Sequence, residues 1–375
     1  MVGTLALRNL FHDRIRLIVT LVGILFSVVL VAVQLGLYMG ARKMIIGMID
    51  NANAQIWITA FGTKSFEEAP FLNGSERFTA LSTPGVAGAI PLVVSFAQWR
   101  KPGGGSQLCV VVGTDPKDNG LKPWNVIAGS PEAVSNPNAV MVDRSYLSSL
   151  AINGMGDTAQ IENVRVEVAG MTDGIRSFTT APYVFTSLTR ARRILGGNSQ
   201  QATFFLVQVK PGVDVKQVQT ALRARLPNRE ILTTAEFRNR SLDHWLFGTG
   251  AGIALIGGAL LGLLVGTVIV AQTLYSSTKD HLNEFATLRA LGSSKGYINK
   301  VILAQAGLSA IMGYALGMSI ALAILYASRD TALPIVMTPG LAVGLFTLTL
   351  GMCAISAVSA IMKVTRIDPA MVFAR

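Results

Sequence analysis

Four long stretches of the chain lack Asp, Glu, Lys and Arg and are rich in aliphatic residues. They run from Leu17 to Ala41, from His244 to Thr278, from Val301 to Ser328 and from Thr331 to Met362. Each exceeds the roughly 20 apolar residues that a helix needs to cross a bilayer. The pattern predicts four transmembrane helices and excludes a disordered, fibrous or soluble nucleic-acid-binding protein.

The segment between the first two stretches has a different pattern, and it is long enough for one or two domains. Alternating or continuous apolar runs predict strands there, and helical periodicity lies between them. The expected strands are Gln55 to Ala60, Leu108 to Gly113 and Val164 to Val168, and the expected helices lie near Asp143 to Leu150, Ser187 to Leu195 and Val213 to Leu226. We therefore expect a mixed α/β domain.

Two strand–helix modules are expected within this domain, one from about Asn51 to Gly113 and one from Ala202 to Thr233. In the second, Phe204 to Val209 forms the strand, Pro211 and Gly212 the turn, and Asp214 leads the helix.

These patterns divide the chain into eight segments. They are a cytoplasmic N-terminal amphipathic segment 1–16, transmembrane helix 1 at 17–41, an extracytoplasmic α/β domain 42–245, transmembrane helix 2 at 249–275, a cytoplasmic loop 278–297, transmembrane helix 3 at 301–327, transmembrane helix 4 at 340–362 and a cytoplasmic C-terminus 363–375.

The distribution of the basic residues behind the net charge of +11 predicts the orientation of the chain in the membrane. Short loops rich in Lys and Arg stay in the cytoplasm, whereas long domains translocate largely regardless of charge. Both termini and the loop before the third span should therefore be cytoplasmic, which also accounts for the basic excess without nucleic acid. The basic residues that mark this side are Arg8, Arg14, Arg16, Lys279, Arg289, Lys295, Lys300, Lys363, Arg366 and Arg375.

The first apolar stretch is longer than the h-region of about 7 to 15 residues of a signal peptide, and no convincing cleavage site follows it. We expect it to be a retained anchor. The two cysteines, Cys109 and Cys353, fall in the α/β domain and the last span, so the predicted topology forbids a disulfide between them.

The sequence offers little catalytic chemistry. Only His244, at a boundary, is ionisable within the four stretches, which disfavours an ion-coupled secondary transporter. The three histidines are scattered and predict no metal site. No GxxxxGK[ST] or GxSxG motif occurs, and Gly103 to Gly105 is interpreted as a hairpin tip. We therefore expect no enzymatic activity, ATP site or cofactor in this chain.

Small residues recur every four positions in two of the predicted spans, and this spacing lets helix backbones approach closely in lipid. Packing within one bundle and a dimer seam both fit this pattern. The residues are Gly258, Gly262 and Gly266 in the second span and Ser309, Gly313, Gly317 and Ala321 in the third.

The cytoplasmic loop predicts a short amphipathic helix. Its apolar stripe recurs at intervals of three, and a glycine follows as a left-handed cap. The stripe consists of Leu282, Phe285, Leu288 and Leu291, with Gly292 as the cap. Such a helix either lies on the lipid interface or fills a groove on a cytoplasmic partner, and the composition does not separate these two interpretations.

The same loop carries a family resemblance. Glu284-Phe-Ala-Thr-Leu-Arg-Ala-Leu-Gly292 resembles the E-x-x-x-LRA-φ-G signature of FtsX-like permeases, the membrane subunits of MacB/LolCDE-type ABC systems. Other similar motifs follow the family's order along essentially the whole chain. They are Leu7-Arg-Asn-Leu10 with Arg14 and Arg16, Pro84-Gly-Val-Ala-Gly-Ala-Ile-Pro91, Gly156-Asp157 and Arg366-Ile-Asp-Pro-Ala370. The match is most similar to DevC-type exporter permeases, whereas the nucleotide-binding domain fused to MacB itself has no counterpart.

The resemblance implies a dimeric permease in the bacterial inner membrane, bound to two cytoplasmic ABC ATPase subunits that hold ATP and Mg. It implies a periplasmic membrane-fusion adaptor and an outer-membrane channel as further partners, and export or extraction of a lipid, glycolipid, lipoprotein or peptide. ATP-driven motion would pass through the loop helix to the external domain. An FtsX-like regulator of a cell-wall hydrolase and a stand-alone sensor remain as alternatives.

The resemblance also assigns roles to the loop residues. Leu282, Phe285, Leu288 and Leu291 would fill a groove on the ATPase. Glu284 and Arg289 would lie at its polar rim, and Gly292 would end the helix.

Overall fold

A computed structural model of the chain describes residues 2–281, 287, 294–329, 331 and 333–364. The chain divides into two compact units. The helical unit comprises Met1–Met39, Ile253–Arg329 and Pro334–Arg375. The α/β unit comprises Gly40–Gly252 and Asp330–Leu333.

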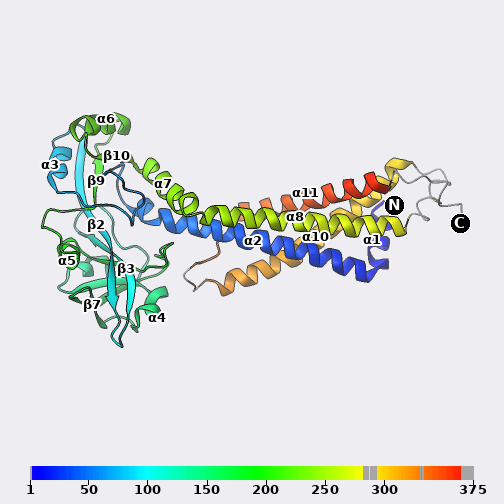
Figure 1. Cartoon of the computed structure of the whole chain (residues 1–375), viewed down its shortest axis with the longest axis horizontal. Helices are drawn as coiled ribbons and strands as arrows, with labels where there is room; N and C mark the ends of the chain where they lie inside the picture. Colours follow the sequence, from blue (N-terminus) through cyan, green and yellow to red (C-terminus); the bar gives the residue numbers. More distant parts are fainter. Residues whose placement is uncertain (1, 282–286, 288–293, 330, 332, 365–375) are drawn as a thin grey trace. The chain divides into compact units, whose positions relative to one another are not determined.

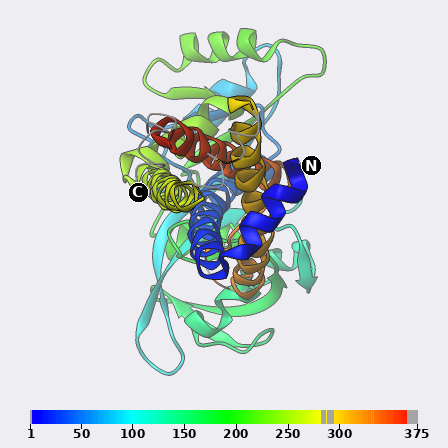
Figure 2. The ribbon, with the colours of Figure 1, turned by 90° about the vertical axis from the view of Figure 1, so that its right-hand side faces the viewer.

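The helical unit is built from long apolar helices (Figures 1 and 2). Its elements are α1 (Val2–His12), α2 (Arg14–Asn51, which continues into the α/β unit), α8 (Ala251–Asp280), α10 (Lys295–Ala327) and α11 (Pro339–Val364). Four of them, α2, α8, α10 and α11, are long and apolar enough to cross a membrane. The predicted four-span class is therefore confirmed.

Burial in the helical unit fits a lipid environment. Its inner core combines small and branched side chains such as Val28, Ala306 and Ala310, all nearly inaccessible. On the outside, Leu260 and Leu264 remain about three-fifths exposed without polar neighbours to shield them. Large apolar surface of this kind is unfavourable in water and favourable against acyl chains. The amphipathic helix α1 packs against α10 in the same unit (Figure 2).

The α/β unit contains one mixed sheet of ten strands (Figure 1). The strands are β1 (Ile56–Thr59), β2 (Val86–Arg100), β3 (Ser106–Thr114), β4 (Val126–Ala128), β5 (Ala139–Asp143), β6 (Thr158–Ile161), β7 (Val164–Thr172), β8 (Tyr183–Ser187), β9 (Phe204–Val209) and β10 (Glu230–Thr233). Their order is β10-β1-β9-β2-β3-β8-β5-β7-β4, and β6 pairs with β2 and β7. The predicted α/β class, inserted between the first two spans, is confirmed.

The long strand β2 belongs to two halves of this sheet. Its first part, to Leu92, pairs with β9, and its second part, from Val93, pairs with β3. The first half carries α3 (Ser75–Leu81), α6 (Val215–Arg225) and α7 (Thr234–Leu242). The second half carries η1 (Pro131–Ser135), η2 (Arg144–Tyr146), α4 (Leu147–Leu150) and α5 (Leu188–Ile194).

The elements that local patterns predicted in this unit are present. The strands at Ile56, Leu108, Val164 and Phe204 are all present, and Asp214 caps α6 by accepting a hydrogen bond from the Lys216 amide. The glycine run is a hairpin tip between β2 and β3, as expected. The two predicted modules, however, are not separate, because β1 of the first lies between β9 and β10 of the second.

An aromatic cluster holds the first half of the sheet together. The Trp57 ring lies 4.9 Å from that of Phe237 and 5.4 Å from that of Phe204, and Phe66 stacks on Phe204 at 5.7 Å. All four side chains are fully buried. Phe237 belongs to α7, so truncating it to Ala should cost about 3 to 5 kcal/mol and loosen α7 from the sheet.

Candidate functional site

The predicted coupling residues Leu282, Glu284, Phe285, Leu288, Arg289, Leu291 and Gly292 lie outside the described residues. The structure does describe the segment that precedes them, the end of α8. Asp280 Oδ2 accepts a hydrogen bond from Arg16 Nη2 at 2.5 Å, and Arg16 also pairs with Asp13. The C-terminal end of α8 is thereby tied to the first turn of α2.

The five glycines singled out in the spans all face α2 of their own chain. A β-carbon at Gly266 would lie 2.5 Å from Ser27 Cβ, and one at Gly258 would lie 2.6 Å from Gln34 Nε2. The remaining three meet Leu30 and Val31 (Gly262), Ile24 (Gly313) and Val28 (Gly317). Intramolecular packing accounts for these contacts, and a dimer seam through the same residues stays a prediction.

The α/β unit has two helical connections to the spans, and the second of them begins with α7. The sequence Thr233-Thr-Ala-Glu236 folds into a capping box, in which the Thr233 hydroxyl accepts from the Glu236 amide and the Glu236 carboxylate accepts from the Thr233 amide. Such a reciprocal cap satisfies two backbone donors that a helix start otherwise leaves unpaired. It fixes the start of α7 on the end of β10.

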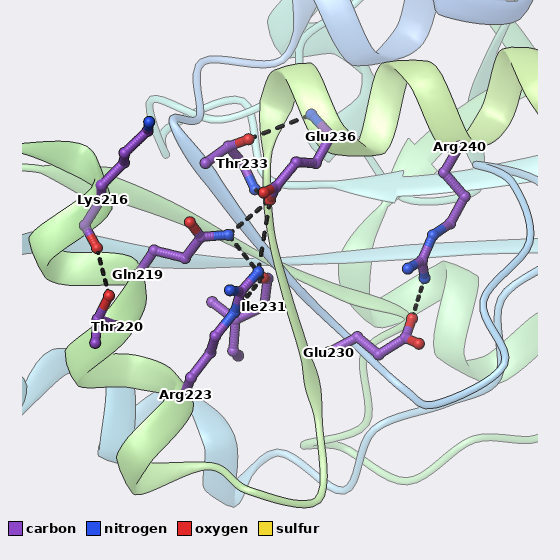
Figure 3. A network of polar contacts seen from close by, with 9 residues as sticks. All are labelled: Lys216, Gln219, Thr220, Arg223, Glu230, Ile231, Thr233, Glu236 and Arg240. Carbon is purple, nitrogen blue, oxygen red and sulfur yellow. Dashed lines mark hydrogen bonds and ion pairs between the residues drawn. The ribbon is translucent and has the colours of Figure 1, made fainter.

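Side chains from α6 strengthen this corner (Figure 3). Gln219 Nε2 donates to Glu236 Oε2 at 2.6 Å and to the carbonyl of Ile231 on β10 at 2.9 Å. Arg223 also donates to that carbonyl and lies 3.7 Å from the Glu236 carboxylate. Partial burial raises the pKa of Glu236, but the hydrogen bonds from Thr233 and Gln219 outweigh it and lower the pKa below its ordinary value. Glu236 is therefore held as a carboxylate.

Two ion pairs anchor the remainder of α7. Arg240 pairs with Glu230 on β10 (Figure 3). Arg238 donates from Nε and Nη2 to Asp50 Oδ1, at 2.8 and 2.5 Å. Asp50 lies in the last turn of α2, so this second pair joins the two helical connections directly.

The chain then passes through η3 (Asp243–Gly248), a π-helical segment, to α8. Its Trp245 Nε1 donates at 3.2 Å to the buried carboxyl group of Glu67. Glu67 also accepts from Ser65 Oγ at 3.2 Å and from the Tyr183 hydroxyl on β8. Burial raises the pKa of Glu67 although these hydrogen bonds act in the opposite direction. This carboxyl group connects η3 with the interior of the sheet.

We call these four contact sets on α7 and η3 the junction corner: Glu236 with Gln219 and Arg223, Arg240 with Glu230, Arg238 with Asp50, and Glu67 with Trp245 and Tyr183. Sequence reasoning missed all of it. Only the Thr-x-x-Glu spacing at Thr233 gave a local signal. Tyr183 and Trp245 are separated from Glu67 by more than a hundred residues, which no periodicity links.

Within the described part of the chain, no group of three or more His, Cys, Asp or Glu residues is arranged to hold a metal ion. Cys109 and Cys353 are both buried and free. The junction corner consists of a helix cap, ion pairs and hydrogen bonds.

Comparison with known proteins adds two domain matches. Residues 17–225 match the MacB-like periplasmic core domain, and residues 256–369 match the FtsX-like permease C-terminal domain.

Two curated relatives cover most of this chain. It is 23% identical over 402 residues to the pyoverdine export ATP-binding/permease protein PvdT of Pseudomonas syringae pv. tomato, an alignment that covers 97% of this chain and 58% of that protein. It is 25% identical over 340 residues to the macrolide export ATP-binding/permease protein MacB 2 of Aeromonas hydrophila, covering 85% of this chain and 52% of that protein. The chain therefore spans little more than half the length of these relatives.

Among solved structures, the periplasmic region of MacB from Actinobacillus actinomycetemcomitans matches with a TM-score of 0.36 and 13% identity. The match covers 52% of this chain and 94% of that one.

Proposed function

The chain belongs to the FtsX-like permeases that carry a MacB-like periplasmic core domain, and from this membership we propose that it is the membrane subunit of an ABC transporter. The two relatives combine an ATP-binding part and a permease in one longer protein, by their names. This chain corresponds to little more than half of each. A cytoplasmic ABC ATPase, which binds ATP and Mg, is the proposed partner.

The subunit acts by transmitting motion. ATP-driven movement enters at the cytoplasmic loop, passes along α2 and α8, and changes the state of the α/β unit on the far side of the inner membrane. The observation that carries this proposal is the Arg238–Asp50 pair, which ties the two helical connections to each other. Both residues lie in the α/β unit, so this pair and the other contacts of α7 hold the end of α2 and α7 on the sheet.

The α/β unit would then work on export cargo or on a periplasmic adaptor that leads to an outer-membrane channel. The word "export" in both relatives' names favours transport over regulation of a cell-wall hydrolase. A lipid, glycolipid, lipoprotein or peptide is the proposed class of cargo. A second permease copy completes the assembly, with both termini of each copy in the cytoplasm.

The docking step is tested with the double variant Phe285→Ala/Leu288→Ala. If both side chains fill a groove on the ATPase, each loses apolar contact worth about 1.5 to 3 kcal/mol, which is enough to weaken capture by more than a hundredfold. Copurification of the ATPase and stimulated ATP hydrolysis are measured at equal permease abundance.

The matched control is Phe78→Ala/Leu81→Ala, which removes the same side chains from exposed positions on α3. This control should capture the ATPase as the wild type does. Reversing the charge of Arg289 should have a smaller effect, since exposed ion pairs are worth about 0 to 1 kcal/mol. Unchanged capture and hydrolysis in Phe285→Ala/Leu288→Ala would refute docking and favour a helix on the lipid surface.

A further inference from the structure

A row of donor side chains crosses the second half of the sheet, far along the chain from the junction corner. In the strand register, Arg100 on β2 lies opposite Gln160 on β6, and Gln160 lies opposite Arg165 on β7. Paired residues of adjacent strands share one face of a sheet. That face is the exposed one, because Trp99, which precedes Arg100, is fully buried on the other.

A groove of about 600 Å³ lies along this row. Its lining includes Arg100, Lys101, Thr158, Gln160 and Arg165, together with the tip of the β2–β3 hairpin. The volume falls within the range of about 300 to 1,000 Å³ that is typical of small-molecule sites. The groove therefore offers three cations, an amide and a hydroxyl to one ligand.

No ion pair engages the cations of this groove within the described part of the chain. Arg100 Nη2 donates to Asn163 Oδ1 at 3.2 Å, and the side chains of Lys101 and Arg165 make no hydrogen bond or ion pair there. Two acids are near in the sequence. Glu162 accepts a hydrogen bond from the Gln98 amide at 2.7 Å, and Glu167 lies opposite Thr158 on the exposed face; neither forms an ion pair with the three cations, which outnumber these two acids.

A second groove, beside β10, shows the contrast. It is also lined by three arginines, but each of them has an acidic partner: Arg223 pairs with Glu236, Arg229 with Glu76, and Arg240 with Glu230. Those arginines connect parts of the fold through ion pairs. Among the described residues, none of the three cations of the β2–β6–β7 groove has an acidic partner of this kind.

Helix α5 adds to the positive potential. Arg190 Nη1 donates to the carbonyl of Arg165 at 3.2 Å, which brings a further guanidinium group to this edge. Partial burial, together with the charge of Arg193, lowers the pKa of Arg190 below its ordinary value. A concave surface on which cations outnumber acids concentrates negatively charged ligands.

We propose that the β2–β6–β7 groove binds a phosphate-bearing anion with two or more charged groups. Arginine forks match phosphate oxygens with paired hydrogen bonds, and lysine adds a point charge. Arg100 and Arg165 are two strand spacings apart, about 9.5 Å between backbones, so their side chains reach separate charged groups or both ends of a diphosphate. A soluble phosphate compound and a phospholipid headgroup share this chemistry. The site does not depend on the proposed transport function, because it requires neither ATP nor a partner.

The experiment uses the full chain in neutral detergent and titrates it with inorganic pyrophosphate by calorimetry. We expect saturable binding that Arg100→Gln/Arg165→Gln weakens by at least roughly tenfold, since hydrogen bonds to charged groups are worth about 1.5 to 3 kcal/mol each. The control is Arg144→Gln/Arg225→Gln, which removes the same net charge from arginines outside the groove and should change affinity by less than roughly twofold.

If the double variant folds poorly, a single substitution in the row Arg100–Gln160–Arg165 tests the proposal independently. Gln160→Glu places a carboxylate between the two arginines on an exposed strand position and should weaken pyrophosphate binding while the thermal unfolding temperature stays that of the wild type. A second titration with water-soluble short-chain phosphatidic acid separates the sources. If phosphatidic acid binds with the same affinity as pyrophosphate, the ligand is a soluble phosphate compound. If phosphatidic acid binds at least roughly tenfold more tightly, the ligand is a phospholipid headgroup. The absence of saturable binding, or binding that survives both variants, overturns the proposal, and neither result bears on ATPase coupling.

Discussion

Glu67 is a titratable residue whose chemistry is altered by burial. Its carboxyl group is buried and receives hydrogen bonds from Ser65, Tyr183 and Trp245. No described cation pairs with it. A carboxylate removed from water without a cation is costly, so this group keeps its proton to a higher pH than an ordinary glutamate.

We expect Glu67→Gln to remove a pH dependence of stability. The pKa of Glu67 is raised above 4.5 in the folded chain, so the folded state holds a proton that the unfolded state has released. Stability therefore falls as pH rises from about 4.5 through the raised folded pKa. Wild type should lose more thermal stability than Glu67→Gln over this window, followed by tryptophan fluorescence in detergent. Glu68→Gln is the neighbouring control, and parallel curves for wild type and Glu67→Gln would contradict the argument.

The individual residues differ in how far sequence could reveal them. The Thr233 and Glu236 pair carries a recognisable local spacing. Asp50 and Arg238 carry none, because an exposed acid at a helix end and an arginine far along the chain meet only after the sheet has formed. The stripe around Phe285 was visible as a pattern, but it lies outside the described residues.

Among the elements, the pairing of α2 with α8 depends on glycine. The Ser27 hydroxyl donates to the Gly262 carbonyl at 2.9 Å, and no side chain fits at Gly266 without displacing Ser27 or Met352. By contrast, a β-carbon at Gly257 in the same helix would meet no atom within 4 Å. The two positions form a matched pair for substitution.

Gly266→Leu should destabilise the helical unit by about 1 to 3 kcal/mol through overpacking, whereas Gly257→Leu should change its stability by less than about 0.5 kcal/mol. Both variants gain the same helix propensity, so the difference isolates the packing. Thermal unfolding in detergent and the oligomeric state are measured together. If the Gly266→Leu protein were as stable as the Gly257→Leu protein, the close packing of α2 against α8 at Gly266 would be contradicted. If Gly266→Leu abolished the dimer without a loss of stability, a dimer interface through these glycines would be favoured instead.

The elements also show what local sequence can and cannot predict. Hydrophobic periodicity located the spans and strands such as β1 and β9, because each is a property of consecutive residues. It could not predict that β1 lies between β9 and β10, since that pairing joins segments about 150 residues apart. The sharing of β2 between two halves of the sheet is likewise a product of long-range packing.

For the complete chain, the orientation in the membrane is still a prediction. Basic residues around the loop and the termini favour a cytoplasmic location for Ser294 and an external one for Asn136. Cysteines at these exposed positions should react oppositely with an impermeant reagent in intact cells, with Asn136→Cys labelled and Ser294→Cys protected. Burial raises the pKa of the Cys109 thiol to about 12, and Cys353 is also buried, so the native cysteines contribute little background. The reverse labelling pattern would invert the proposed direction of transmission.

Transmission itself is measured with spin labels at Asn239→Cys on α7 and Tyr326→Cys on α10, both exposed and in different units. The permease, in complex with its ATPase and diluted with unlabelled chains, is compared with and without trapped ATP by pulsed electron paramagnetic resonance. We expect the distance distribution to shift on trapping ATP in the otherwise wild-type chain, to shift less in Arg238→Gln, and to stay unchanged in Phe285→Ala/Leu288→Ala. An unchanged distribution with ATP trapped on the bound ATPase, or a full shift in the docking variant, would contradict transmission from the loop to the α/β unit.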